Sequence, residues 1–152
     1  MATTANDKRV KGNVVIEGTA TGPILMTMTA FNAVAAWTKA KNYSSPEYAA
    51  LDTDWQHPWD GTDLRGRIIC FPAEVGSTHS PLPFLDLIKD EIGPAGIIVG
   101  EADPLLLAGN ILSKVWYGPS IPIMEYPTDE LMKHFKDGDI VTMGDEGTIQ
   151  SA

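Results

Sequence analysis

The feature that most constrains this chain is a run of three short apolar segments, separated by two helical patterns, between residues 67 and 126. The segments RIICFP (67–72), AGIIVG (95–100) and IPIMEY (121–126) are apolar along nearly their whole length. Such segments are typical of strands buried on both faces of a parallel sheet. Because the stretches between them have helical periodicity, the alternation predicts an α/β fold with a parallel sheet at its centre.

Three helices are predicted around these strands. The first covers residues 81–92 and carries one stripe of large apolar side chains. The second covers residues 103–116, with Asp103 as its N-cap and Pro104 at its first position, and it places Leu107, Ile111 and Val115 on one side. The third covers residues 128–135, and its late basic residues suit the negative end of the helix dipole. We expect the apolar stripes to form the core.

The two ends of the chain predict further strands. Residues 10–29 have a strand-turn-strand pattern, which indicates an N-terminal β-hairpin. Residues 139–150 predict two strands around a Gly-Asp-Glu-Gly turn. Residues 1–9 are polar and unpatterned, so we expect a flexible tail there. The remaining residues, 10–152, are expected to form a single compact domain.

A long stretch of weak periodicity, residues 30–65, separates the N-terminal strands from the α/β unit. It carries Trp37, Trp55 and Trp59 among small and polar residues. Compact domains seldom contain so long a loop without a use for it. We therefore expect either a binding lid or a surface that docks on a partner, with the tryptophans in buried contacts.

Charge and cysteine content exclude several classes of function. The chain has 11 basic and 20 acidic residues, a formal net charge of −9. Such an acidic surface repels nucleic acid and anionic membranes, although it can equally serve solubility. Cys70 is the single cysteine, so an internal disulfide and an all-cysteine metal site within this chain are excluded. The three histidines form no metal-ligand pattern. With no signal sequence or membrane span, the expected location is cytoplasmic.

The segment Gly76–Ser80, the Gly76–Ser80 turn below, is the candidate functional site. It joins a predicted strand to a helix, so backbone amides and the positive end of a helix dipole converge there. Such a place attracts carboxylates and phosphates, and it favours ionisation of a serine hydroxyl. The structural alternative is simple helix capping, for which serine and threonine are preferred.

The donors of this turn are crowded at its start, because Pro81 and Pro83 have no N–H. The expected donor groups are three hydroxyls, one imidazole and five amides, those of Ser77, Thr78, His79, Ser80 and Leu82. The turn lacks the spacing of a serine-hydrolase elbow and of a phosphate-binding P-loop. His79 could add positive charge, or it could be an ordinary surface residue. His57, in a His-Pro turn, is a further candidate whose structural alternative is also open.

An ordered set of motifs between residues 57 and 122 resembles the swivel domain, or small subunit, of the aconitase X group of hydro-lyases. In this chain the motifs are His57-Pro58-x-x-Gly61, Gly66-Arg67-Ile68, Gly76-Ser77-Thr78, Pro94-Ala95-x-Ile97-Ile98, Asp103 to Gly109, and Tyr117-Gly118-x-x-Ile121-Pro122. The resemblance implies a swivelling β/β/α domain, aconitase swivel-like, that closes over a larger catalytic subunit.

The resemblance also implies a chemistry. In aconitase-like enzymes the swivel part supplies a serine base, which here is Ser77, and the larger part holds an iron-sulfur cluster or a mononuclear metal. The expected substrate-binding residues are Gly76, Thr78, His79, Ser80 and His57, with His79 at the position where aconitases have an arginine. Known activities of the group are dehydration of cis-3-hydroxy-L-proline and of mevalonate 5-phosphate. No cofactor is expected in this chain itself.

Two functions of different classes follow. The first is a dehydratase small subunit, inactive without its large subunit, that acts on a small hydroxylated carboxylic acid. The second is a non-catalytic anion-binding or partner-binding module that keeps the swivel fold. Pro81 in the first turn of the helix and the altered segment 30–34 favour the second function. Loss of turnover after Ser77→Ala in a reconstituted complex would separate the two.

Overall fold

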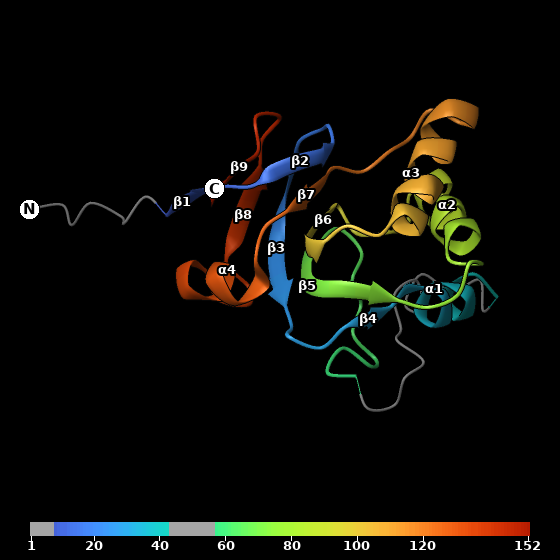
Figure 1. Ribbon diagram of the computed structural model, residues 1–152, viewed down its shortest axis with the longest axis horizontal. Coiled ribbons are helices and arrows are strands. Elements are labelled where there is room, and N and C mark those ends of the chain that lie inside the picture. Colours follow the sequence, from blue (N-terminus) through green and yellow to red (C-terminus); the bar gives the residue numbers. More distant parts are fainter. Residues whose placement is uncertain (1–7, 43–56) are drawn as a thin grey trace, which may run out of the picture.

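A computed structural model describes residues 8–42 and 57–152 of the chain. Its strands are β1 (Arg9–Lys11), β2 (Asn13–Ile16), β3 (Ala20–Met26), β4 (Phe31–Asn32), β5 (Ile68–Val75), β6 (Gly96–Glu101), β7 (Ile123–Glu125), β8 (Ile140–Met143) and β9 (Thr148–Ser151). Its helices are α1 (Ala33–Asn42), α2 (Pro81–Lys89), α3 (Pro104–Trp116) and α4 (Thr128–His134). Figure 1 shows their arrangement.

The strands form one continuous sheet in the order β1-β9-β8-β3-β5-β6-β7-β2, with the short β4 also paired to β5. The central strands β3, β5, β6 and β7 are parallel, as the alternation of strands and helices predicts. The outer strands pair antiparallel. The strand β3 joins the two regions, because its first residues pair with β8 and its last residues pair with β5.

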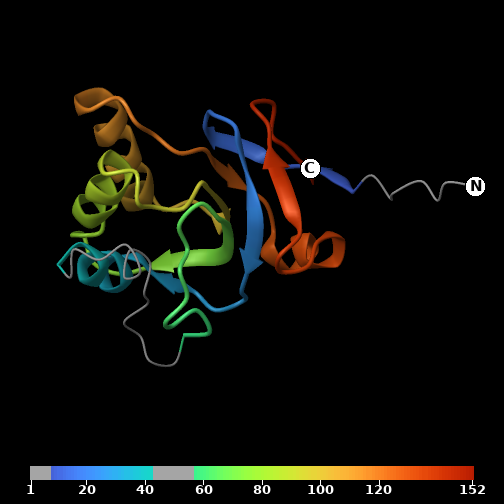
Figure 2. The same ribbon diagram turned by 180° about the vertical axis from the view of Figure 1, so that it is seen from behind.

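The parallel strands separate two apolar clusters, one on each face. Alternate residues of β5 point to opposite faces, so Ile69 and Phe71 belong to one cluster while Ile68 and Cys70 belong to the other. The first cluster packs against α1, α2 and α3, and the second against α4 and the strands β8 and β9. Figures 1 and 2 show α1–α3 on one side of β5 and α4 with β8 and β9 on the other. The layers are therefore β/β/α.

The predicted N-terminal hairpin is wrong, although its strands exist. The strand β2 pairs with β7, and β3 pairs with β5 and β8, so consecutive strands lie in different parts of the sheet. Apolar alternation and the glycines between the strands do not specify a partner strand. The predicted C-terminal pair is confirmed, because β8 and β9 form a hairpin around residues 144–147.

The long loop predicted for residues 30–65 contains a helix. In α1 the helix starts directly after Asn32, whose side-chain Oδ1 accepts a hydrogen bond from the Ala35 amide at 3.0 Å. This is an N-cap contact. Trp37 and Trp59 are buried in the core, at 0% and 3% exposure, so they are not free to form a docking surface. Trp55 lies outside the described residues.

The predicted tail, residues 1–9, is too long at its C-terminal end. Arg9 begins β1, and the carbonyl of Lys8 accepts a hydrogen bond from the Ser151 amide at 3.1 Å. Residues 1–7 of the predicted tail lie outside the described residues. Across residues 8–42 and 57–152, no helix has the length and apolar character that crossing a bilayer requires.

Candidate functional site

The Gly76–Ser80 turn lies between the carboxyl end of β5 and the first residue of α2. In open sheets of parallel strands, ligands bind outside the carboxyl ends of the strands. The apolar residues at the start of β5 are buried, as are most of those in α2, and they fix the two sides of the turn. Residues 76–79 themselves are exposed. Figure 1 shows β5 ending near α1 and α2.

Ser77 is at the exposed start of this turn. Its side-chain Oγ accepts a hydrogen bond from the His79 amide at 3.1 Å. A backbone amide that donates to a hydroxyl oxygen also stabilises the corresponding alkoxide, because the donor is already oriented toward the developing charge. Ser77 is therefore exposed, and its hydroxyl oxygen already has one hydrogen-bond donor oriented toward it.

Some of the backbone amides in the turn donate hydrogen bonds to acceptors within the turn itself. The amide of Ser80 donates to the Ser77 carbonyl at 3.0 Å, and the amide of Leu82 donates to the His79 carbonyl at 3.2 Å. The His79 amide donates to Ser77 Oγ. Of the five amides expected as anion donors, three are thus engaged within the turn. The amides of Ser77 and Thr78 donate to no acceptor in the described part of the chain, so these two are available to a ligand.

Ser80 differs from its neighbours because it is buried, at 1% exposure. It occupies the N-cap position of α2 without making a side-chain capping bond. Its Oγ lies instead 2.8 Å from Glu74 Oε1 and 2.8 Å from the carbonyl oxygen of Ser77. The hydroxyl of Ser80 therefore faces inward, where it supports the turn from beneath, and not outward, where a substrate would bind.

Gly76 permits this close approach. A Cβ atom at residue 76 would lie 3.0 Å from Glu74 Oε1, 3.0 Å from Ser80 Oγ and 3.4 Å from Asn32 Oδ1. Three oxygen atoms, from β5, from the start of α2 and from the cap of α1, therefore surround the glycine. Its role in the structure is to let these polar groups pack under the turn.

Glu74 is the ionisable side chain beneath the turn. Partial burial raises the pKa of its carboxyl group, the hydrogen bond from Ser80 opposes this effect, and the nearby charge of Asp103 adds to it. Burial disfavours a carboxylate because the surrounding protein solvates the charge less well than water does. Glu74 therefore holds a proton more readily than an exposed glutamate.

His57 is buried in the core. It is 5% exposed, and its ring lies 5.8 Å from the ring of Phe31 and 5.3 Å from that of Trp59, between centroids. The Nδ1 atom accepts a hydrogen bond from the Trp59 amide at 3.1 Å. The predicted substrate contact of His57 does not fit this burial, and its geometry favours the structural alternative.

His79 lines an open cleft of about 450 Å³ beside the turn. The cleft lies between α1, α2 and the end of α3, and its wall includes Leu82, Trp116 and Tyr117. These three large side chains are 50%, 61% and 55% exposed. Exposed aromatic side chains beside a polar site are typical of surfaces that bind a partner or a ligand.

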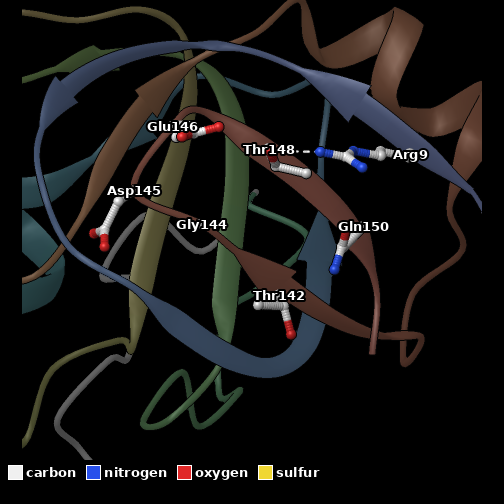
Figure 3. Close-up of a pocket in the computed structure, with 7 residues that line it drawn as sticks. All are labelled: Arg9, Thr142, Gly144, Asp145, Glu146, Thr148 and Gln150. Carbon is white, nitrogen blue, oxygen red and sulfur yellow. Dashed lines mark hydrogen bonds between the residues drawn. The ribbon is translucent and has the colours of Figure 1, made fainter.

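A second pocket, of about 340 Å³, lies along β1, β8 and β9. Figure 3 shows its polar lining, including the hydrogen bond from Arg9 to Thr148 and the side chains of Asp145 and Glu146 on the hairpin turn. No predicted site residue lines it. The Gly76–Ser80 turn and the cleft at His79 therefore remain the candidate site.

The described residues do not fit a metal centre. No group of three histidine, cysteine or acidic side chains in residues 8–42 and 57–152 could hold a metal ion. Cys70 is buried within the sheet, and burial raises the pKa of its thiol to about 12. Because a thiolate is the form that binds metals, Cys70 is unsuited to ligation.

Comparison with known proteins decides the family. The family model of the aconitase X swivel domain matches residues 9–151. The chain belongs to the aconitase X swivel domain family. The aconitase X of Thermococcus kodakaraensis, solved in its holo form, has the same fold as this swivel domain. The TM-score is 0.75 at 25% identity, over 95% of this chain and 98% of that one. The predicted swivel fold is thus confirmed.

Curated relatives of this swivel domain carry dehydratase names. The phosphomevalonate dehydratase small subunit of Methanothermobacter thermautotrophicus is 30% identical over 98 residues, which are 64% of this chain and 70% of the relative. The cis-3-hydroxy-L-proline dehydratase of Pseudomonas aeruginosa is 36% identical over 70 residues. This second match covers 46% of the swivel domain and 12% of that protein.

The structure adds two residues that the sequence analysis of this swivel domain does not contain. Glu74 and Asn32 both contribute oxygen atoms beneath Gly76. Glu74 has one signal in the sequence, because it is an ionisable residue close to the end of an apolar segment and two residues before the glycine. Asn32 comes from a distant part of the chain, and only the pairing of β4 with β5 brings it to the turn.

Proposed function

We propose that this chain is the small subunit of an aconitase X-type dehydratase, in which Ser77 is the base that removes a carbon-bound proton. The substrate class is a small hydroxylated carboxylic acid. The observation that carries the proposal is the exposed residue Ser77 just before α2. Its hydroxyl oxygen accepts a hydrogen bond from the His79 amide. The names of the curated relatives support the reaction class.

Ser77 acts as an alkoxide in this proposal. The amide of His79 and the positive end of the α2 dipole stabilise the negative charge on Oγ. The alkoxide takes the proton from the carbon next to the substrate carboxylate, a double bond forms, and the hydroxyl group leaves from the neighbouring carbon. The abstracted proton then passes from Ser77 Oγ to the departing hydroxide, which restores the alkoxide, so the products are the unsaturated acid and water.

The substrate carboxylate binds at the start of the turn. The amides of Ser77 and Thr78 are available to it, and Gly76, Thr78 and His79 lie on the exposed face of the turn. When the imidazole of His79 is protonated, it adds positive charge to an otherwise acidic chain. Ser80 has a supporting role here because its hydroxyl faces inward. His57 is left out because of its burial.

In this proposal a large subunit supplies the group that assists departure of the hydroxyl. The departing hydroxyl needs an acid or a metal, and the described residues offer no metal site. An iron-sulfur cluster or a mononuclear metal in the large subunit would provide that chemistry when bound. The cleft at His79, with its exposed Leu82, Trp116 and Tyr117, is where we expect part of the large subunit to lie.

Reconstitution tests the proposal. The chain is purified alone and together with an aconitase X large subunit from the same source, and each preparation is assayed with mevalonate 5-phosphate and with cis-3-hydroxy-L-proline. We expect turnover only in the assembled complex. Ser77→Ala should lower turnover by about 10³-fold or more while the complex still assembles, a loss within the range for a general base.

The control is Ser151→Ala, a change of the same side chain on β9 that should leave turnover as it is. Wild-type turnover in the Ser77→Ala complex would reject the base assignment. A chain that binds the large subunit without supporting turnover of any hydroxy acid would favour the second function, a non-catalytic anion-binding or partner-binding module. The local turn that Ser77 forms with the His79 amide is compatible with that function as well.

A further inference from the structure

Three oxygen atoms meet beneath the Gly76–Ser80 turn, and the hydroxyl of Ser80 has a single hydrogen to share between the other two. The Oγ atom of Ser80 is 2.8 Å from Glu74 Oε1 and 2.8 Å from the Ser77 carbonyl oxygen. Both distances are those of O–H···O hydrogen bonds. A hydroxyl group has one hydrogen, while a carbonyl and an ionised carboxylate can only accept. One hydroxyl hydrogen forms a linear hydrogen bond to only one acceptor at a time, so two full hydrogen bonds at this oxygen need a second hydrogen.

Protonation of Glu74 supplies the second hydrogen. The carboxylic acid then donates from Glu74 to Ser80 Oγ, and Ser80 donates to the carbonyl of Ser77. The result is one directed chain of hydrogen bonds from β5 to the backbone of Ser77. With an ionised Glu74, the Ser80 hydroxyl must donate either to the carboxylate or to the carbonyl, so one 2.8 Å contact loses its hydrogen.

The surroundings of Glu74 favour the neutral acid. Its backbone belongs to β5 and pairs with Phe31 of β4, and the side chain is partly buried. One further carboxyl group acts from a neighbouring element: the charge of Asp103, at the N-cap of α3, disfavours the ionised form of Glu74. A like charge nearby disfavours ionisation of a carboxyl group.

We propose that Glu74 is a positioning residue for Ser77: as a neutral acid it holds the Gly76–Ser80 turn in place through the hydroxyl of Ser80. The geometry beneath the turn stands independently of the reaction, and only its catalytic meaning rests on the proposed function. Glu74 does not touch the substrate in this account. It sets the position of the Ser77 backbone, and hence of the base.

The test is a pH titration by NMR on the full chain, which needs no substrate. The carboxyl carbon of Glu74 and the amides of Ser77 to Ser80 are followed across the acidic and neutral range. We expect the turn amides to shift together with the Glu74 carboxyl, at a midpoint above that of an exposed glutamate. Asp103→Asn removes a like charge but remains a good helix cap, so it should lower that midpoint.

Variants of Glu74 separate positioning from general stability. Glutamine can donate to Ser80 Oγ at every pH, so Glu74→Gln should keep the turn amides at their low-pH positions throughout the titration. Glu74→Ala should displace them and speed hydrogen exchange of the Ser80 amide about tenfold, the loss expected for one hydrogen bond. Glu146→Gln makes the same charge change on the exposed hairpin turn, and it should titrate like the wild type.

Two results would overturn the proposal. One is a turn that titrates with the wild-type midpoint in Glu74→Gln. The other is a pair of identical turn spectra for Glu74→Gln and Glu74→Ala. Failure of the proposed function is a different observation: Ser77→Ala would leave turnover of the complex unchanged, whether or not the turn follows the ionisation of Glu74.

Discussion

At the scale of single residues, Gly76 is the position in the candidate site that least tolerates an added side chain. An added Cβ would approach Glu74 Oε1 and Ser80 Oγ to 3.0 Å. Gly76→Ala should separate these two oxygens and lower the free energy of unfolding by about 1–2 kcal/mol, a usual cost of overpacking. Urea unfolding measures the change.

Gly93→Ala is the matched control, because its Cβ would lie at an ordinary 3.7 Å from Leu87. This substitution should change the free energy of unfolding by less than about 0.5 kcal/mol. Equal losses of unfolding free energy in the two variants would show that the polar cluster beneath Gly76 does not determine the cost of a side chain at residue 76.

Cys70 provides a second test at this scale. Its side chain is 0% exposed, it contacts Thr128 Oγ1 at 3.7 Å, and burial raises the pKa of the thiol to about 12. We expect the native chain to resist alkylation by iodoacetamide at pH 8, because the thiolate is the reactive form. The unfolded chain should react fully. Rapid labelling of the native chain would contradict the described packing of β5.

At the scale of elements, Asn110 connects α3 to the segment that leads into β7. Its Nδ2 donates to the Ile121 carbonyl at 2.6 Å, and its Oδ1 accepts from the Ile121 amide at 3.0 Å. The side chain is 0% exposed. Asn110→Leu keeps the branched shape of the side chain but leaves both backbone groups unpaired, so it should lower the free energy of unfolding by about 2–3 kcal/mol.

The same helix offers a control for Asn110. Ser113 is fully buried, and its Oγ has no hydrogen-bond partner among the described residues. Ser113→Ala removes an unpaired polar atom, so thermal unfolding should occur at the same or a higher temperature. A loss of stability in this variant as large as that of Asn110→Leu would contradict the hydrogen-bond explanation.

Local sequence patterns predict the elements well where apolar periodicity is strong. The three central strands and the helix α2 have buried residues at the expected positions. In α3 the predicted core stripe is wrong, because Ile111 and Val115 are 48% and 72% exposed while Leu106 and Asn110 are buried. The helix α1 escapes prediction because its alanines give a weak apolar stripe, and its cap, Asn32, has no other clear signal. The partner of β2 could not be predicted, because β7 lies more than 100 residues away along the chain.

In the candidate site, too, the sequence predicts some features and not others. The exposed turn around Ser77 follows from a glycine, small hydroxyl residues and a helix, all of which are adjacent in the sequence. The inward direction of Ser80 and the burial of His57 do not follow from it, because both depend on side chains from other elements. A sequence pattern places a residue on an element, but packing decides which way its side chain faces.

At the scale of the whole molecule, two glutamates give stability opposite pH dependences. Hydrogen bonds from the Ala102 amide and from Asn13 lower the pKa of Glu125. Its contribution is therefore present above the ordinary pKa of 4.5 and is lost as the pH falls through the folded value. The raised pKa of Glu74 has the opposite effect, and its contribution is lost as the pH rises through its folded value.

Single glutamine variants separate these effects. Glu125→Gln should flatten the acid side of the curve of unfolding free energy against pH, below about pH 4.5. Glu74→Gln should flatten the curve above this pH. Denaturant unfolding at a series of pH values gives both curves. Unchanged curves in both variants would contradict the hydrogen bonds assigned to Glu125 and the burial assigned to Glu74.

The most direct test of the whole account is proton exchange at the substrate carbon. The assembled complex is placed in D₂O with the hydroxy acid that it turns over, and deuterium incorporation next to the carboxylate is followed by NMR. We predict that Ser77→Ala abolishes incorporation while the complex still assembles and binds the acid. Incorporation at the wild-type rate in Ser77→Ala would show that another group removes the proton.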